Sequence, residues 1–158
     1  MIQHPIDPVF DSNSRILILG SFPSVKSREN QFFYGHPQNR FWKVISAVTD
    51  SPLPGTVVEK RELLLKNKIA LWDVIASCDI TGSSDSSIKN VVPNDLSPIL
   101  ETADIQTIFV NGKIAEKYYN KYLRPATGRD AVCLPSTSPA NALWSLEKLC
   151  IAWSAILT

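Results

Sequence analysis

Four short apolar runs alternate along the chain with segments of helical periodicity. The first run, residues 15–20 (RILILG), is apolar at successive positions, which is typical of a strand buried on both faces. The other three runs are residues 69–75, 107–112 and 131–135. Buried strands separated by helices indicate a parallel sheet that is covered on both sides. The sequence therefore predicts an α/β protein, a three-layer α/β/α sandwich with a central four-stranded parallel sheet.

Helical patterns occupy the intervals between these runs. Apolar residues recur there at the three- and four-residue spacing of one helix face. One interval opens with Thr56-x-x-Glu59, which is the pattern of a capping box. The expected helices cover residues 41–48, residues 56–66, a stretch from near Asn94, and residues 113–123.

The C-terminal segment has the clearest helical pattern. Ser138 is its expected N-cap and Pro139 its expected first helical residue, because these residue types are favoured at those positions. The apolar residues that would share its buried face are Leu146, Leu149, Trp153 and Ile156.

The size and charge of the chain limit its class. A chain of 158 residues predicts one domain, residues 1–158, that buries about two thirds of its unfolded surface. Sixteen basic and fifteen acidic residues leave a net charge of +1, which is not the charge of a general nucleic-acid coat. This net charge is still compatible with a protein that contacts a few phosphates locally, because counterion release depends on the phosphate contacts made and not on the total charge.

The cysteines form neither a metal-binding nor a disulfide pattern. Cys78, Cys133 and Cys150 lie far apart, without Cys-x-x-Cys or Cys/His spacing. We therefore expect three reduced thiols, with Cys133 and Cys150 in the core, and neither a metal nor a cofactor. The chain also has no apolar run of about 20 residues and no signal-peptide pattern, so we expect no membrane partner and a cytoplasmic setting.

The loop after Gly20 is the most unusual segment. Ligands of parallel sheets bind at the carboxyl ends of the strands, where this loop is expected. Residues 21–38 read SFPSVKSRENQFFYGHPQ, without a clear apolar period. Loops of this length are often functional, although by composition alone the aromatic trio favours a lid packed on the core.

Familiar motifs are absent from this loop. Gly20 opens neither Gly-x-Gly-x-x-Gly nor Gly-x-x-x-x-Gly-Lys, which disfavours dinucleotide and P-loop sites. The same absence argues against a small-molecule enzyme on a flavodoxin-like sheet. Residues 20–24 (GSFPS) are not a nucleophile elbow, and with only His4 and His36 in the chain a Ser-His-Asp hydrolase is disfavoured.

Three segments resemble a known family. Residues 17–24 (LILGSFPS) with 34–42 (YGHPQNRFW) resemble the first motif of the uracil-DNA glycosylase superfamily. Residues 134–141 (LPSTSPAN) resemble the final loop of that superfamily, and residues 71–74 (LWDV) match between the two. The nearest branch is the deoxyinosine (hypoxanthine) DNA glycosylases, followed by the mismatch-specific uracil glycosylases. The resemblance covers essentially the whole chain and implies a uracil-DNA glycosylase-like fold.

The resemblance implies base flipping, in which the damaged nucleotide leaves the stack and its base enters a pocket. Tyr34 matches the stacking position of the superfamily. Cleavage puts negative charge on the departing base, and hydrogen-bond donors stabilise such charge. Backbone N–H groups around Gly20, Ser21 and Phe22 are placed for that role at the end of the first strand.

The catalytic residue that the resemblance implies is Asn39. Many superfamily members hold the attacking water with Asp or Asn directly after the first strand, where this chain has Phe22. In the deoxyinosine branch an asparagine of the His-Pro-x-Asn segment takes that role, and Asn39 matches it. Asparagine is also a good helix cap, so capping is the alternative role, and the two roles are compatible.

Asp73 and His36 are expected to bind the base. Asp73 matches the position at which superfamily members often read the base edge, and its carboxylate would accept a hydrogen bond from a ring N–H of hypoxanthine. A helix cap or a core salt bridge is the alternative for Asp73. His36 would donate to the base or to a phosphate, or else form a turn packed on Trp42.

The final loop and two basic residues are the expected DNA contacts. Uracil glycosylases often have His or Asn where this chain has Ser136, Thr137 and Ser138. Hydroxyls, together with the N-terminal amides of the last helix, suit phosphate binding. Removal of uracil is for this reason less expected than removal of hypoxanthine. Lys26 and Arg40 are expected to add phosphate contacts, with a solvated charged face as the alternative.

Together these features predict a monofunctional DNA glycosylase that acts as a monomer in base excision repair. It would hydrolyse the N-glycosidic bond of deoxyinosine, with uracil as a second candidate base, in duplex or single-stranded DNA. No lysine stands out as a Schiff-base nucleophile. The alternative is a non-catalytic DNA- or nucleotide-binding module on the same fold. The Gly/Ser-rich residues 79–87 are either a mobile DNA-facing loop or only a surface loop.

Overall fold

A four-stranded parallel sheet forms the centre of the molecule in the computed structural model, which describes residues 1–157. Its strands are β2 (Ile16–Gly20), β3 (Ile69–Asp73), β6 (Thr107–Asn111) and β7 (Ala131–Leu134), in the order β3-β2-β6-β7. All neighbouring pairs are parallel. The predicted four-stranded parallel sheet is therefore confirmed.

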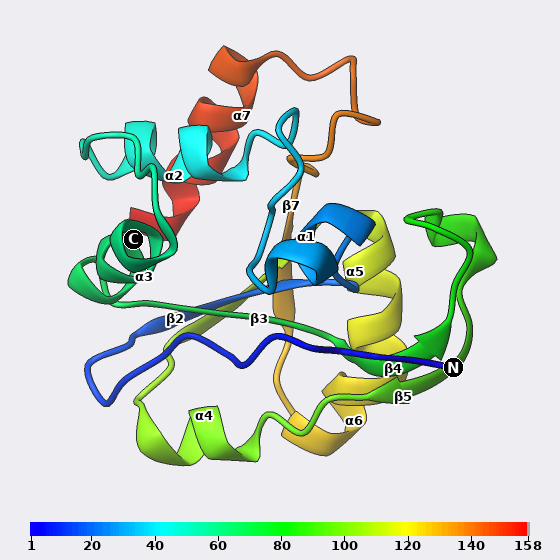
Figure 1. Cartoon of the computed structure of the whole chain (residues 1–158). Coiled ribbons are helices and arrows are strands. Elements are labelled where there is room, and N and C mark those ends of the chain that lie inside the picture. Colours follow the sequence, from blue (N-terminus) through cyan, green and yellow to red (C-terminus); the bar gives the residue numbers. More distant parts are fainter. Residues whose placement is uncertain (158) are drawn as a thin grey trace.

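Helices cover both faces of this sheet (Figure 1). One face carries α2 (Phe41–Val48), α3 (Val57–Lys66) and α7 (Leu146–Trp153), which is followed by a 3₁₀ turn, Ser154–Leu157. The other carries α4 (Ser97–Thr102), α5 (Lys113–Tyr118), a π-helical turn (Tyr119–Leu123) and α6 (Arg124–Thr127). Within residues 1–157, none of the helices has the length and apolar character needed to cross a bilayer.

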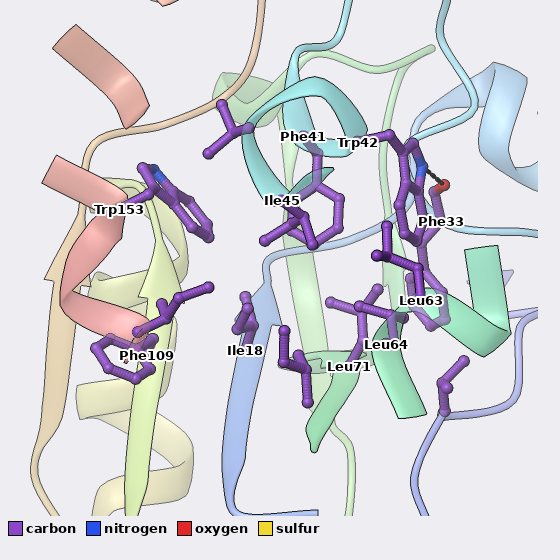
Figure 2. Packing of buried hydrophobic residues seen from close by; sticks show 14 of the residues in the cluster. Ile18, Phe33, Phe41, Trp42, Ile45, Leu63, Leu64, Leu71, Phe109 and Trp153 are labelled. Atoms are coloured by element: carbon purple, nitrogen blue, oxygen red, sulfur yellow. Dashed lines mark hydrogen bonds between the residues drawn. The ribbon is translucent and has the colours of Figure 1, made fainter. Parts of the chain in front are cut away.

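Each face of the sheet has its own apolar core because side chains alternate along a strand. Ile18 belongs to the core under α2, α3 and α7, together with Phe41 and Trp153, all of them closed to solvent. Figure 2 shows this layer, including the Trp42 indole N–H that donates to the carbonyl of Phe33. The neighbouring residues of β2 face the opposite core.

A second, three-stranded antiparallel sheet was not predicted. It consists of β1 (Ile2–Gln3), β4 (Ile75–Asp79) and β5 (Lys89–Pro93), in the order β1-β4-β5, with a 3₁₀ turn at Asp85–Ser87 between β4 and β5. The apolar run 69–75 was expected to be one strand, but it divides at Val74. The amide of Asn94 donates to the carbonyls of Asp73 and Ile75 and holds this corner. The helix expected near Asn94 accordingly begins later, at Ser97.

The long loop after β2 contains a short helix, α1 (Val25–Asn30), which was also not predicted. Ser24 caps it by accepting a hydrogen bond from the Ser27 N–H. Gln31 ends it with a left-handed backbone conformation. The six helical residues bury only one side chain, Ser27, so they carry no apolar stripe that a sequence pattern would show.

The start of the last helix was predicted wrongly. α7 begins at Leu146 and is capped by Ser145, whose hydroxyl accepts a hydrogen bond from the Lys148 N–H. Residues 135–144 are an irregular loop. Ser138 and Pro139 therefore lie in this loop and not at a helix N-terminus. Leu149 and Trp153 are buried as expected, but Leu146 is largely exposed.

The three cysteines are free thiols. Cys78 is buried, whereas Cys133 and Cys150, which were expected in the core, are only half-buried because both lie near the surface of their elements. Removal of the thiols from water raises the pKa of all three, so the thiol form is favoured over the thiolate.

Candidate active site

A cavity of about 330 Å³ opens at the carboxyl ends of the central strands. Its wall comes from residues 20–24 after β2, Asp73 at the end of β3, residues 111–114 after β6 and residues 136–139 after β7. Ligands of open parallel sheets bind in this position because the loops converge there. The cavity is therefore the candidate active site.

Most of the residues singled out from the sequence line this cavity. They are Gly20, Ser21, Phe22, Tyr34, His36, Asn39, Asp73, Ser136, Thr137 and Ser138. Arg40 and Lys26 are absent from its wall. The tertiary structure thus brings together the first loop, the end of β3 and the final loop, which lie far apart in the sequence.

Asn39 presents its amide nitrogen as the free end of its side chain. Its Oδ1 accepts hydrogen bonds from the Phe41 N–H and from the Thr137 hydroxyl, both at 2.9 Å. Because a backbone N–H can only donate, the contact with Phe41 fixes which end of the amide is oxygen. Asn39 therefore binds the N–H of Phe41, the first residue of α2, from the position before the N-cap Arg40, and it still has N–H donors available. The capping alternative is thus met only in part, and it leaves room for a catalytic role.

A partly buried chain of hydrogen bonds holds Asn39 in this orientation. Asn111 Nδ2 donates to the Thr137 hydroxyl and to the Tyr34 hydroxyl, each at 3.1 Å. Asn111 Oδ1 accepts from the Thr137 N–H. Since the Thr137 hydroxyl accepts from Asn111, its own proton is directed to Asn39. Asn111 was not singled out from the sequence, although it stands at the carboxyl end of a predicted strand.

Tyr34 contributes its hydroxyl to the base of the cavity. Its ring stacks on Phe41, with ring centroids 4.0 Å apart, and the backbone of Tyr34 is left-handed at φ 52°. Burial and the nearby Asp73 carboxylate raise the pKa of Tyr34 well above its ordinary value, while the Asn111 hydrogen bond acts in the opposite direction. The hydroxyl is therefore protonated and, having accepted from Asn111, can donate.

Gly20 lets Tyr34 and Asp73 approach the backbone of β2 closely. Gly20 and Asp73 are register partners at the ends of β2 and β3. A Cβ atom on Gly20 would overlap Asp73 Oδ1 and would lie 2.9 Å from the Tyr34 hydroxyl. An acceptor oxygen and a donor hydroxyl thus lie side by side against Gly20, in positions that only a glycine permits.

The other oxygen of Asp73 bonds to a residue from the N-terminus. Asp73 Oδ2 lies 2.8 Å from His4 Nε2, and both side chains are almost fully buried. The core contact expected as one alternative for Asp73 is thus present as a hydrogen bond with His4, and Asp73 also lines the cavity. No pattern in the sequence pointed to His4, because 69 positions separate the two residues.

His36 lies half-buried in the cavity wall. Its Nδ1 accepts a hydrogen bond from the Gln38 N–H at 3.1 Å. The proton of the neutral imidazole therefore sits on Nε2, which is the nitrogen left to donate.

The expected phosphate contacts of Arg40 and Thr137 are not supported by the structure. The Arg40 guanidinium donates to the backbone carbonyls of Ser138, Asn141 and Trp144. Thr137 is fully buried, and its hydroxyl and N–H both bond within the protein. These residues shape the final loop, because the terminal nitrogens of Arg40 and the hydroxyl and N–H of Thr137 already bond within the protein.

Ser136, Ser138 and Lys26 stay accessible. Both serines are half-buried in the cavity wall. Lys26 is an exposed residue of α1, and its Nζ lies 3.5 Å from Glu29 Oε2 in an ion pair at the surface. The prediction that the N-terminal amides of the last helix bind phosphate beside these serines is wrong, because α7 starts at Leu146.

The Gly/Ser-rich residues 79–87 form one side of the cavity and are anchored to α1. Ser83 accepts a hydrogen bond from the Val25 N–H at 2.8 Å, and Arg28 donates to the Gly82 carbonyl at 2.6 Å. Ser83 and Asp85 line the cavity. The segment is thus part of the cavity wall. Neither of the two alternatives, a mobile DNA-facing loop or only a surface loop, included this role.

Leu143 was missed by the sequence analysis. Its side chain is 93% exposed, more than that of any other large hydrophobic residue in the described chain. It lies in the final loop, seven positions after the cavity residue Ser136. A leucine within a loop of Pro, Ala and Asn has no periodic signal, so only the structure shows its exposure.

Comparisons with known proteins agree with this geometry. A family model described as the uracil DNA glycosylase superfamily matches residues 8–156. The chain belongs to the uracil DNA glycosylase superfamily. The resemblance predicted from its motifs is thereby confirmed, and the protein is a DNA glycosylase that acts on DNA as substrate.

Individual relatives of this superfamily member cover nearly its full length. A protein of Methanosarcina acetivorans named hypoxanthine DNA glycosylase is 37% identical over 150 residues, 94% of each chain. One of the same name from Methanosarcina barkeri is 37% identical over 143 residues, 89% of each chain. The solution NMR structure of a candidate uracil DNA glycosylase from Methanosarcina acetivorans has a TM-score of 0.81, at 32% identity and full coverage of both chains. The glycosylase thus has the predicted fold.

Proposed function

We propose that this glycosylase is monofunctional and removes hypoxanthine from deoxyinosine in DNA by base flipping, with uracil as a second substrate. The observation that carries this proposal is the pair of groups above Gly20, where Asp73 Oδ1 and the Tyr34 hydroxyl converge. The two relatives named hypoxanthine DNA glycosylase support the same base.

The pair is complementary to the lactam edge of a deaminated base. Hypoxanthine presents a carbonyl oxygen beside a ring N–H, and uracil presents the same arrangement. The Tyr34 hydroxyl would donate to the carbonyl, and Asp73 Oδ1 would accept from the ring N–H. Adenine presents an amino group and an unprotonated ring nitrogen in those places. The amino group of adenine would face the Tyr34 hydroxyl, donor against donor, and its ring nitrogen would face Asp73 Oδ1, acceptor against acceptor. Buried polar groups would then be left unpaired.

Asn39 is the proposed catalytic residue, and its free Nδ2 defines how it acts. Oδ1 already accepts two hydrogen bonds, so Asn39 binds the attacking water by donating an N–H to it. A second lone pair of that water then faces the sugar carbon as the base departs. Holding water in an attack geometry lowers the barrier through orientation. Backbone at Gly20, Ser21 and Phe22 lies beside the departing base.

Leu143 is proposed as the wedge that replaces the flipped base in the duplex. Proteins that unstack DNA frequently insert an apolar side chain between base steps. An almost fully exposed leucine on a loop whose other end lines the cavity suits this role. Ser136, Ser138 and Lys26 are the proposed phosphate contacts. We propose that one copy of the chain acts alone, since the groups assigned to base recognition and catalysis all line one cavity of a single chain.

Strand cleavage after base removal is not proposed. Lys113 lies in the cavity wall, but its residue is exposed to solvent. A nucleophilic lysine is activated by desolvation or by a neighbouring cation. Borohydride treatment during turnover should therefore trap no covalent complex between protein and DNA.

An oligonucleotide assay tests the proposal. A labelled strand with one deoxyinosine is incubated with the protein and then heated in alkali, which breaks the strand at an abasic site. We expect a break at inosine, a slower one at uracil, and none at adenine. Without alkali the strand should stay intact. No break at any deaminated base would point instead to a non-catalytic DNA-binding module.

Two substitutions at Asn39 test its role. Asn39→Ala should lower the excision rate by about 100-fold or more, the range for loss of one preorganised donor. Asn39→Asp keeps Oδ1 but loses Nδ2, and it should be comparably inactive. Activity of Asn39→Asp near the wild-type level would show that the attacking water is bound by a side-chain oxygen and not by the N–H of Asn39.

A further inference from the structure

His4 lies beside the cavity but outside residues 8–156, the part of the chain that the family model matches. Its side chain is 3% exposed and that of Asp73 is 5% exposed. We propose that His4 is a positioning residue, which fixes the Asp73 carboxylate so that one defined oxygen, Oδ1, reads the base. This inference rests on the proposed function, because it assigns the orientation of the group that recognises the lactam edge.

The protonation pattern of His4 follows from its neighbours. The Ile6 N–H donates to His4 Nδ1 at 3.1 Å, so this nitrogen is an acceptor and carries no proton. The proton of the neutral ring is then on Nε2, which faces Asp73 Oδ2 at 2.8 Å. His4 therefore donates to the carboxylate through a tautomer that the backbone of Ile6 selects.

The ring has no room to turn away from this contact. Phe22, Phe33 and Trp72 surround it, with ring centroids 5.9, 6.1 and 6.2 Å from that of His4. The Trp72 indole N–H donates to the carbonyl of Ile6 and so ties the residue whose N–H donates to Nδ1. The backbone N–H of His4 donates to the carbonyl of Ala76 at 2.8 Å.

The consequence for Asp73 is that its two oxygens become different. Oδ2 is engaged by His4, whereas Oδ1 lies over Gly20 on the Tyr34 side. Loss of the His4 donor would free the carboxylate to rotate about its Cβ–Cγ bond. An acceptor that no longer lies beside the Tyr34 hydroxyl cannot match the fixed spacing of a lactam edge, so recognition would weaken without any change in the fold.

A double-mutant cycle tests whether His4 acts through Asp73. Single-turnover excision of inosine is measured for His4→Phe, His4→Gln, Asp73→Asn and the double variant His4→Phe/Asp73→Asn. We expect His4→Phe to lower the rate by about tenfold or more, as loss of a hydrogen bond to a charged group predicts. We expect little further loss when it is added to Asp73→Asn, because residues that act as a unit are non-additive. His4→Gln carries an amide N–H at the position of Nε2 and should restore most of the rate.

Tyr119→Phe is the matched control for a merely structural effect. It removes the hydrogen bonds of a buried hydroxyl to Thr127 and to the carbonyl of Arg129, outside the cavity wall, and leaves the contact between His4 and Asp73, so it should lower thermal stability and leave the excision rate near wild type. Nitrogen-15 NMR of the imidazoles adds a readout independent of activity. The chain has only two histidines, and His4 should show a protonated Nε2 and an unprotonated Nδ1.

The outcomes separate this inference from the proposed function. Excision by the wild type with fully additive effects of His4→Phe and Asp73→Asn, or no rescue by His4→Gln, overturns the positioning role alone. A protonated Nδ1 at His4 near neutral pH also overturns it. Absence of excision by the wild type on inosine and uracil overturns the proposed function, and this inference with it.

Discussion

The Thr137 hydroxyl donates a hydrogen bond to Asn39 Oδ1 at 2.9 Å across 98 positions of sequence. This bond joins the first loop of the sheet to the last. It also occupies the Asn39 side-chain oxygen, which leaves the amide nitrogen as the end available for catalysis. The side chain of Asn39 is thus oriented by a residue that had been expected to contact DNA.

Thr137→Val tests this orientation. Valine keeps the shape of threonine but removes the hydroxyl, so Asn111 Nδ2 and Asn39 Oδ1 each lose one of their two hydrogen bonds. We expect the free energy of unfolding to fall by about 1–3 kcal/mol and excision to fall as well, though less than for Asn39→Ala. Denaturant unfolding and single-turnover assays measure both. Thr137→Ser retains the hydroxyl and is the control, and an equal loss of activity in Thr137→Ser would argue against the hydrogen bond as the cause.

Gly20→Ala tests the close approach of Asp73 and Tyr34 to β2. The added Cβ would overlap Asp73 Oδ1 and approach the Tyr34 hydroxyl, so the variant should fold but lose excision by about tenfold or more. Gly55→Ala is a matched control, since its Cβ would meet only Glu59 at 3.6 Å. Circular dichroism and excision rates decide the result. Full activity of Gly20→Ala would mean that the base does not enter beside these two groups.

Tyr34→Phe separates the hydroxyl from the ring. Phenylalanine can still stack on Phe41, but it cannot donate to a base carbonyl. We expect excision of inosine to fall by about tenfold while affinity for undamaged DNA stays unchanged. Rates and binding are measured on matched oligonucleotides. If Tyr34→Phe excises inosine like the wild type, Tyr34 serves only as a stacking surface.

Arg40 and Lys26 should differ in the salt dependence of DNA binding. Lys26→Gln should weaken binding and reduce the slope of log affinity against log salt by about one, as loss of a phosphate contact does. Arg40→Met removes hydrogen bonds to three carbonyls of the final loop and should cost about 1.5–3 kcal/mol of stability with the slope unchanged. If Arg40→Met also reduced the slope of log affinity against log salt, the phosphate contact predicted for Arg40 from the sequence would be supported.

Leu143→Ala should affect activity but not stability. The side chain is 93% exposed, so unfolding free energy should change by less than about 0.5 kcal/mol. Excision from duplex DNA should fall by about tenfold, whereas a single strand, which has no stack to open, should be affected less. Leu53→Ala, another exposed leucine, is the control. Equal losses on duplex and single strand would exclude the wedge.

The central sheet and the position of the cavity could be predicted from the sequence alone. Strands buried on both faces need apolar side chains at successive positions, and that local pattern is visible in residues 15–20 and 107–112. The rule that ligands bind where parallel strands end then identified the loops after Gly20 and Asp73. The His-Pro-x-Asn segment added Asn39 through its resemblance to the superfamily.

Only the tertiary structure decided how these groups are oriented. The directions of Asn39 and Asp73 depend on single hydrogen bonds from Thr137 and His4, which arrive from 98 and 69 positions away. Such contacts give no periodic pattern in the sequence, because each depends on a single side chain and not on a helix or strand face whose residues recur at a fixed spacing. The divided run at Val74 and the late start of α7 have the same origin. Asn94 and Arg40, both distant in sequence, bind the backbone carbonyls of those segments and override their local preferences.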